Sequence, residues 1–267
     1  MTWPHDGMSF TFQDRRALIT GASSGIGRAL ALELARAGVD SVVVARREAL
    51  LAELAGEIEQ IGRKAVVVAG DITDPDVRTR ALDAAQRQLG GLDLLVNNAG
   101  VSAHGRFHQA GPERLRQIME VNFFAPAELM RAAVPLLRKS PQPAVVNVSS
   151  ILGRRGLPWN SEYCASKFAL QGLSEAVRPE LAKLGIGLLV VSPGTTDTEF
   201  FDHLIEKQGE IPWTQSRGVS AEAVARATLD AIRCGKREIT PNLRGRMLLW
   251  AHRLAPRTLD RWLRRYG

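Results

Sequence analysis

Tyr163 and Lys167 are the residues whose types and spacing most directly suggest chemistry. They stand four residues apart in the run SEYCASK, a spacing that places both side chains on one face of a helix. A phenol with a pKa near ~10 is a poor acid or base at neutral pH, and a nearby cation such as Lys167 favours its phenolate form. A tyrosine and a lysine at this spacing also occur as a surface pair, so the pair alone does not establish a site.

Ser150 adds a third polar group. It lies thirteen residues before Tyr163 and directly follows the apolar run AVVNVS at residues 144–149. The carboxyl ends of parallel strands face the crevice where ligands bind, so this hydroxyl can meet the phenol and the ammonium there. Ser149 is a competing serine. A serine, a tyrosine and a lysine together suit acid–base catalysis at a carbonyl oxygen.

A second cluster, TGASSGIG at residues 20–27, is typical of a phosphate-binding loop. Gly21 allows a tight turn, Gly25 lets the backbone approach a pyrophosphate, and Gly27 permits close packing of helix on strand, while helix N–H groups face the anion. Glycines also serve ordinary turns. The position between an apolar strand and a helical stretch is therefore what favours a dinucleotide site.

The elements that must position these groups follow a repeated β-α pattern. Six short apolar runs alternate with stretches of helical period, and the runs are RALIT, SVVVA, KAVVVA, LDLLV, AVVNVS and GIGLLVVS. Runs that are apolar throughout indicate strands buried on both faces, hence a parallel sheet covered by helices on each side. Helices are predicted at 25–37, 47–62, 75–89, 112–138, 161–184 and 220–234. The sequence therefore predicts a single α/β domain with a doubly wound parallel sheet.

The glycine spacing G-x-x-x-G-x-G and the Tyr-x-x-x-Lys pair resemble the short-chain dehydrogenase/reductase family, and the resemblance covers most of the chain. It implies a Rossmann-like fold and the catalytic residues Asn122, Ser150, Tyr163 and Lys167, with the family spacing selecting Ser150 over Ser149. Tyr163 would exchange a proton with the carbonyl oxygen and Ser150 would bind that oxygen. Lys167 would lower the tyrosine pKa and bind the nicotinamide ribose, while Asn122 would hold a water in a proton relay.

The same resemblance implies a cofactor site built from several loops. Its members are Gly21, Ser23, Ser24, Gly25, Ile26, Gly27, Arg46, Arg47, Asp71, Ile72, Asn98, Ala99, Gly100, Tyr163, Lys167, Pro193, Gly194, Thr196 and Thr198. Arg46 stands where relatives that prefer NAD carry an acidic residue, and a guanidinium can bind a 2′-phosphate, so NADP(H) is the expected cofactor. Each of these groups also has an alternative role without a cofactor. The arginine pair can be solvated, Asp71 can cap a helix or form a turn, and the run NNAG at 97–100 can form a turn.

The expected reaction is the interconversion of a secondary alcohol and a ketone. Residues 199–218 match the stretch that closes over substrate in this family. Their apolar members, Phe200, Phe201, Leu204, Ile211 and Trp213, favour a lipophilic small-molecule substrate, although they can also pack on the sheet. The alternative function is a catalytically silent NADP-binding sensor or scaffold. Against it stands the intact set of catalytic residues.

Composition narrows the setting. The two cysteines, Cys164 and Cys234, form no disulfide framework and no metal-type spacing with histidines, so no metal is expected and a cytoplasmic location is the default. No apolar stretch is long enough to span a bilayer, and the first residues, MTWPHDGMSFTF, are not expected to act as a secretory signal. The resemblance also suggests a homodimer or homotetramer through the helices near 112–138 and 161–184.

The net charge of +7 is concentrated at the C-terminal end. Residues 233–267 hold ten Lys and Arg against two acids, which argues against a protein-wide nucleic-acid surface. Residues 244–267 form a basic amphipathic extension of a catalytic domain at 1–243, predicted as two helices broken at Pro256. Its apolar face can pack over the substrate pocket or a neighbouring subunit, or make peripheral contact with a membrane.

Overall fold

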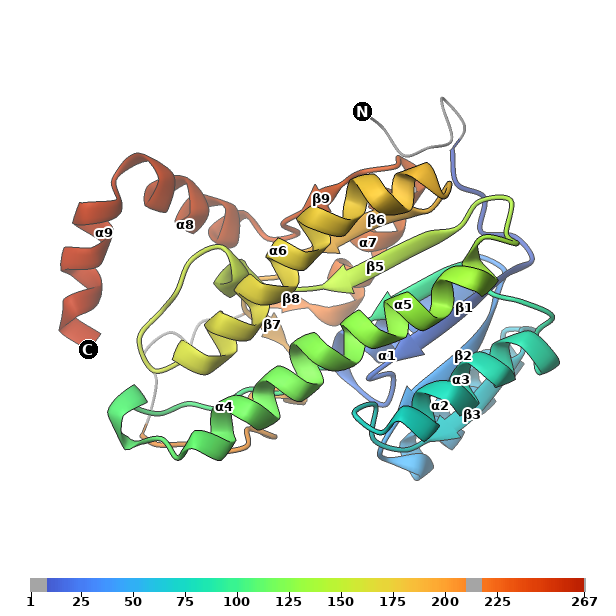
Figure 1. Ribbon diagram of the computed structural model, residues 1–267, viewed down its shortest axis with the longest axis horizontal. Coiled ribbons are helices and arrows are strands. Elements are labelled where there is room, and N and C mark those ends of the chain that lie inside the picture. The colour runs from blue at the N-terminus through green and yellow to red at the C-terminus, as the bar shows by residue number, and fades with distance from the viewer. Residues whose placement is uncertain (1–8, 210–217, 267) are drawn as a thin grey trace.

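The computed structural model describes residues 9–209 and 218–266 (Figure 1). Its centre is a seven-stranded sheet in the order β3-β2-β1-β4-β5-β6-β9, in which all neighbours are parallel. The strands are β1 (Arg15–Thr20), β2 (Val39–Ala45), β3 (Ala65–Ala69), β4 (Leu94–Asn97), β5 (Ala144–Val148), β6 (Gly187–Val191) and β9 (Glu238–Ile239). The predicted doubly wound α/β fold is confirmed. The strand order reverses between β1 and β4, where a ligand crevice is expected.

Helices cover both faces of the sheet. The described helices are α1 (Gly25–Arg36), α2 (Glu48–Gln60), α3 (Pro75–Gln88), α4 (Pro112–Met119), α5 (Ala125–Leu137), α6 (Ser161–Lys183), α7 (Ala221–Arg233), α8 (Leu243–Leu254) and α9 (Pro256–Leu263). Figure 1 shows α5 and α6 in front of the sheet and α1 and α7 behind it. Leu18 and Ile19, neighbours on β1, are both fully buried in different core clusters. This two-sided burial explains why the strands are apolar throughout.

The stretch predicted as one helix at 112–138 is interrupted. Between α4 and α5 lies a π-helical turn, Glu120–Phe124. Turns of this kind add a residue to the helical repeat and are frequent at functional sites. Here the turn holds Asn122, which is buried.

A short chain of polar side chains crosses the apolar core between β4, β5 and α6. Asn97 Nδ2 donates to Asn147 Oδ1 at 2.9 Å, and Asn147 Nδ2 donates to Ser174 Oγ at 2.9 Å. All three residues are buried. Hydrogen bonds of this kind offset the cost of placing amides in an apolar interior.

The remaining elements gather at the carboxyl ends of the strands. A two-stranded parallel ribbon, β7 (Thr196–Asp197) with β8 (Val219–Ser220), follows β6. Helices α8 and α9 project beyond the sheet on the side to which β5 points (Figure 1). The chain turns between Leu254 and Pro256, as predicted. Ile211 and Trp213 of the expected lid lie outside the described residues.

The described residues contain neither a membrane-spanning helix nor a metal-type cluster. No helix there is long and apolar enough to cross a membrane. Nor does this part of the chain contain a group of three or more His, Cys, Asp or Glu side chains that could hold a metal ion.

Candidate active site

A cavity of about 1210 Å³ opens at the carboxyl edge of the sheet. Every predicted cofactor and catalytic residue lines it except Gly27 and Asn122. The cavity runs from the glycine loop and the arginine pair at one end to Tyr163, Lys167 and the apolar lid residues at the other. One continuous space can therefore hold an extended dinucleotide and a substrate beside it.

The glycine loop has the shape that its sequence predicts. Gly21 and Gly25 adopt positive φ angles of 66° and 53°, a conformation that glycine enters without steric cost. A side chain at Gly27 would collide with the Gly21 carbonyl, and one at Gly21 would collide with Ala99. The first turn of α1 contains no acidic residue. The loop thus leaves a cradle at a helix N-terminus, which suits a pyrophosphate.

Asn98 braces this loop from the neighbouring strand. Its Nδ2 donates to the carbonyls of Thr20 and Gly21 at 3.0 and 3.1 Å. The backbone N–H groups of Asn98 and Ala99 both donate to Thr20 Oγ1 at 3.0 Å. The run predicted as NNAG therefore serves the site by holding the end of β1 against the end of β4.

The two arginines after β2 occupy different environments. The Arg46 side chain is exposed at the cavity edge and forms no hydrogen bond or ion pair with any described residue. Arg47 is half-buried: its Nη2 donates to Ser24 Oγ at 2.6 Å and its Nη1 pairs with Glu199 Oε2 at 3.1 Å. His203 Nε2 lies 3.4 Å from the same Nη1. Two guanidinium groups and the hydroxyls of Ser23 and Ser24 thus meet at the cavity edge. This set of donors suits a phosphate.

Asp71 follows β3 and lines the cavity together with Ile72. Its Oδ1 accepts from the backbone N–H and the hydroxyl of Thr73, both at 2.9 Å. The N-cap of α3 is Asp74. Asp71 therefore shapes the turn with one carboxylate oxygen.

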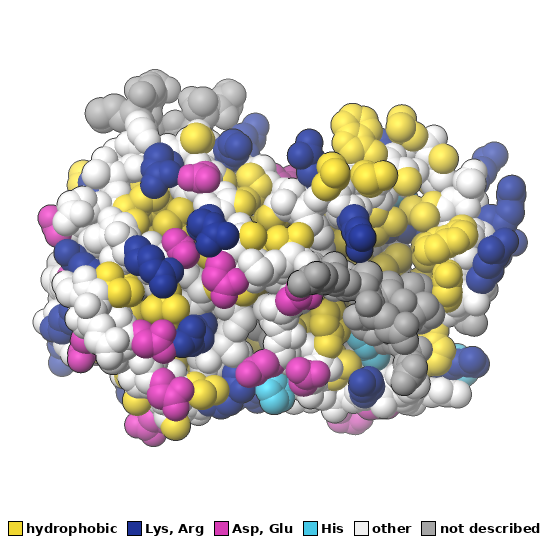
Figure 2. Space-filling model, turned by 180° about the vertical axis from the view of Figure 1, so that it is seen from behind, with side chains coloured by type: hydrophobic (Ala, Val, Ile, Leu, Met, Phe, Trp, Pro, Cys, Tyr) yellow, Lys and Arg dark blue, Asp and Glu magenta, His cyan; other side chains and the backbone are white. Residues whose placement is uncertain are grey.

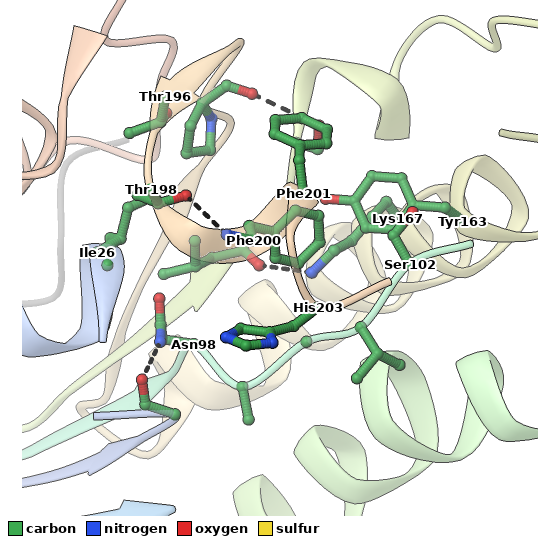
Figure 3. A pocket seen from close by; sticks show the side chains of 18 of the residues that line it. Ile26, Asn98, Ser102, Tyr163, Lys167, Thr196, Thr198, Phe200, Phe201 and His203 are labelled. Carbon is green, nitrogen blue, oxygen red and sulfur yellow. Dashed lines mark hydrogen bonds between the residues drawn. The ribbon is translucent and has the colours of Figure 1, made fainter. Parts of the chain in front are cut away.

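The catalytic candidates converge on the cavity wall. Ser150 follows β5, whereas Tyr163 and Lys167 project from the first turns of α6. Lys167 Nζ donates to Val148 O at 2.9 Å and lies 5.7 Å from the centre of the Tyr163 ring. Figure 3 shows the Lys167 side chain reaching into the cavity beside Phe200 and Tyr163. Ser149 turns away, with its hydroxyl 3.5 Å from the Lys167 carbonyl.

Burial is the largest influence on the pKa values of Tyr163 and Lys167. Burial raises the pKa of Tyr163, and its hydrogen bond with Ser150 acts in the opposite direction. Burial also lowers the pKa of Lys167 to about 8. Lys167 was expected to lower the tyrosine pKa; instead the lowering contribution comes from Ser150, and burial outweighs it. At neutral pH the phenol is protonated and the amine is charged.

Asn122 lies behind the wall rather than in it. Its Oδ1 accepts from Val101 N at 2.9 Å, and its Nδ2 donates to Val101 O and to Ser166 Oγ, also at 2.9 Å. Ser166 belongs to α6, between Tyr163 and Lys167. The amide side chain therefore links α6 to the loop that follows β4, using both hydrogens of its Nδ2 group and one lone pair of Oδ1.

The described part of the expected lid, with the loop before it, reaches from the glycine loop to Tyr163. The Thr198 methyl carbon packs at Gly25, where an added side chain would crowd it. The Phe200 ring lies 5.8 Å from the Tyr163 ring, and Phe201 lies 5.6 Å from Phe200 (Figure 3). Thr196 Oγ1 donates to Gly194 O at 3.1 Å. The predicted loop of residues 193–198 is thus in contact with both halves of the cavity.

Two further residues line the cavity. At position 104 the sequence favours a solvated loop histidine over one that contacts substrate, but His104 is buried against Phe201, and burial lowers its pKa to about 4. Asn242 starts α8, and its Oδ1 accepts from Gly194 N at 3.1 Å. An asparagine before an apolar run is a signal for the start of a helix, so the sequence could have indicated this position. The sequence did not indicate its hydrogen bond with Gly194.

The family follows from these features and from comparison with known proteins. The family model of short chain dehydrogenases matches residues 15–209. The chain belongs to the short-chain dehydrogenase family. This dehydrogenase is 37% identical over 227 residues to the "Hydroxysteroid 11-beta-dehydrogenase 1-like protein" of Gallus gallus, covering 82% of this chain and 75% of the relative. It is therefore an oxidoreductase that acts on small molecules.

Solved structures share the fold of this short-chain dehydrogenase. One is a dehydrogenase from Burkholderia cenocepacia J2315 in complex with NADP, with a TM-score of 0.77, 29% identity, and coverage of 86% of this chain and 97% of the other. A second, from Burkholderia phymatum in complex with NAD, has a TM-score of 0.84 at 24% identity over 91% and 94% of the two chains. This second likeness concerns the fold alone.

Proposed function

We propose that the protein is an NADP(H)-dependent reductase and dehydrogenase that interconverts a lipophilic ketone and its secondary alcohol. The observation that carries this proposal is that the buried Tyr163 lines, together with Ser150 and Lys167, one wall of a cavity that continues to the glycine loop. A catalytically silent cofactor-binding protein would have no need of this arrangement.

The chain's own residues account for proton delivery. Tyr163 is protonated at neutral pH because burial raises its pKa, so it can donate to a carbonyl oxygen in the cavity. Ser150 hydrogen-bonds that oxygen and stabilises the charge that develops on it. The charged Lys167 stabilises the phenolate that Tyr163 leaves behind. The nicotinamide, when bound, supplies or accepts the hydride.

Return of a proton to Tyr163 needs a path from solvent. The Asn122 side chain is committed to Val101 and Ser166, so we assign the relay water to backbone carbonyls of the π-helical turn, whose bonding differs from that of an α-helix. Lys167 is the next group in this relay.

Preference for NADP(H) rests on the arginine pair. An anionic 2′-phosphate beside Arg46 and Arg47 gains charge-assisted hydrogen bonds, whereas a carboxylate at this position would repel it. The hydroxyl of Ser24, already bonded to Arg47, adds a further donor or acceptor.

The lipophilic substrate is inferred from the walls nearest Tyr163. Phe200, Phe201 and Leu157 line this part of the cavity, and the name of the Gallus gallus relative points to a hydroxysteroid. We place the enzyme in the cytoplasm, as a homodimer or homotetramer.

The test is turnover of a panel of ketones and alcohols, followed by nicotinamide absorbance, in the wild type and in Tyr163→Phe. The variant lacks only the phenolic oxygen, so we expect turnover to be lost while NADP(H) binding, followed by protein fluorescence, is retained. Turnover near that of the wild type in Tyr163→Phe would refute the mechanism. If the wild type binds NADP(H) but reduces nothing in the panel, the silent-sensor alternative holds.

A further inference from the structure

The outer face of α8 is an exposed apolar stripe. Its members, Leu243, Met247, Trp250 and Leu254, are 68%, 62%, 59% and 75% exposed. Their spacings of four, three and four residues place them on one face of the helix. Single exposed hydrophobic residues are ordinary, but a contiguous row marks an interaction surface. Trp262 of α9, 45% exposed, adds to the same end of the molecule.

Arginines border this stripe on both sides. With 100° per residue, Arg244 falls on one flank of α8, and Arg246 and Arg253 fall on the other. Helix α9 and the residues that follow it add Arg257, Arg261, Arg264 and Arg265, all exposed. Figure 2 shows yellow side chains bordered by dark blue ones at this end of the molecule. Apolar residues with tryptophan, flanked by arginine, form the pattern of a helix that lies in a membrane interface.

The inner face of the same helix is fixed to the catalytic domain, so the direction of the stripe is set. Gly245 is buried against Ile151 and Asn242. Arg155 pairs with Asp260 of α9 and lies 3.1 Å from His252 Nδ1. The negative charge of Asp260 is therefore balanced by Arg155, which lies outside this segment.

The stripe is continuous with the rim of the catalytic cavity. Leu243, Gly245 and Leu248 of α8 line the cavity, and Leu243 also begins the exposed stripe. Arg244 stands at the same rim, so an apolar molecule that enters from the stripe passes Leu243 and Leu248 beside one guanidinium group.

We propose that α8 and α9 dock on the surface of a membrane containing anionic lipids, and that the cavity receives its lipophilic substrate directly from that membrane. The second half rests on the proposed function; the first does not. A second copy of the chain is a poorer occupant, because a symmetric interface through the stripe would bring two arginine-rich segments together. Anionic headgroups complement them instead.

Sedimentation with vesicles tests the docking. We expect the full-length protein to pellet with vesicles of phosphatidylcholine and phosphatidylglycerol at low salt, and to remain in the supernatant with phosphatidylcholine alone or at high salt. Met247→Ser with Trp250→Ser should abolish binding, and the matched control Leu184→Ser, at the far end of α6, should not. Arg246→Glu with Arg253→Glu should weaken binding by more than about twenty-five-fold, at about fivefold for each arginine lost, whereas Arg87→Glu on α3 should leave it unchanged.

Two outcomes overturn the docking proposal. One is a wild-type protein that stays in the supernatant with anionic vesicles at low salt. The other is a dimer in light scattering that Met247→Ser with Trp250→Ser converts to a monomer, which would make a second copy the occupant. Circular dichroism and NADP(H) binding of each variant establish that it is folded.

Delivery of substrate is tested by turnover. A long-chain ketone dissolved in anionic vesicles and a short water-soluble ketone are compared in the wild type and in Met247→Ser with Trp250→Ser. We expect the variant to lose at least tenfold of its rate on the vesicle-borne ketone only. Equal rates of variant and wild type on both ketones would refute delivery from the membrane. Absence of turnover in a protein that still pellets with vesicles would refute the proposed function and leave the docking intact.

Discussion

Arg47 of the cofactor loop is paired with Glu199 of the lid, with 3.1 Å between Nη1 and Oε2. The two residues are 152 positions apart in the chain, and His203 Nε2 lies 3.5 Å from the same carboxylate. The guanidinium that is proposed to meet a 2′-phosphate is therefore already held by an anion. A 2′-phosphate bound as proposed would compete with Glu199 for this guanidinium.

This competition predicts the behaviour of Glu199→Gln. Removing the carboxylate should tighten NADP binding by less than about fivefold, because both side chains of the pair are partly exposed to solvent and such pairs are weak. NAD binding should not change. The measurement is a fluorescence titration with each nucleotide. Asp202→Asn, an exposed acid in the same lid, is the matched control. If both variants change NADP binding equally, the effect comes from net charge and not from the pair between Arg47 and Glu199.

Arg46→Asp should invert the cofactor preference. A carboxylate repels the 2′-phosphate and can accept ribose hydroxyl groups, so the Michaelis constant for NADP should rise by about tenfold or more, the range for lost charge-assisted bonds. Steady-state kinetics with both nucleotides measure this, with Arg36→Asp as control, because Arg36 ends α1 and does not line the cavity. An unchanged preference in Arg46→Asp would transfer the role to Arg47, which Arg47→Ala then tests.

The pH profile of ketone reduction should reflect Lys167. Its pKa of about 8 means that it is charged below this pH and loses its charge above it, while Tyr163 stays protonated because burial raises its pKa. The ratio kcat/KM for reduction should therefore be level near neutral pH and fall as pH rises through about 8. Lys167→Arg keeps a charge at these pH values, so its lower activity should show no fall near pH 8. An unchanged inflection in that variant would contradict this assignment.

A buried ion pair beside the site should dominate acid stability. Arg114 of α4 and Glu162 of α6 are each only 3% exposed, with Nη2 and Oε1 2.6 Å apart. Arg114→Ala leaves the carboxylate buried and unpaired, so it should cost about 3–5 kcal/mol in the free energy of unfolding. Urea titration measures this. Arg87→Ala, which breaks an exposed pair with Asp83, should cost under about 1 kcal/mol.

The same pair gives a pH dependence of known sign. Burial would raise the pKa of Glu162, but hydrogen bonds from Arg114 and Ser161 outweigh it and hold the pKa below the ordinary 4.5. A lowered pKa means that the stabilisation is complete above pH 4.5 and is lost as the pH falls through the folded value. The wild type should lose this contribution on acidification, and Arg114→Ala should not.

The sequence was sufficient where pattern and physics are local. All six apolar runs became strands, because a strand buried on both faces is visible as uninterrupted apolar residues. β9 was missed, since Glu238 and Ile239 form only two residues of strand with no apolar run. In the stretch 47–62, periodicity predicts burial of Leu50, Leu54 and Ile58. Leu54 and Ile58 are fully buried, but Leu51 is buried in place of Leu50, which is half-buried. Periodicity alone does not distinguish two neighbouring leucines.

The sequence predicted which residues line the site better than it predicted the contacts between them. Motif spacing placed Ser150, Tyr163 and Lys167 on one wall, but no pattern indicated that Glu199 would reach Arg47. The π-helical turn at Asn122 was also hidden, because its sequence, EVNFF, is compatible with an ordinary helix. Such features arise from packing between distant segments, which a single sequence does not display.

The amide pair between Asn97 and Asn147 has a consequence for the alignment of the catalytic groups. Strands made of valine and leucine repeat the same kind of side chain every second residue, so β5 could slide two residues along β4 and still bury apolar groups. That slide would separate the amides, and it would carry Ser150 about 6–7 Å away from the phenol it must meet. The hydrogen bonds that join Asn97, Asn147 and Ser174 thus favour one register of β5 against β4. That register sets the position of the Ser150 hydroxyl relative to the Tyr163 phenol and to Asn98.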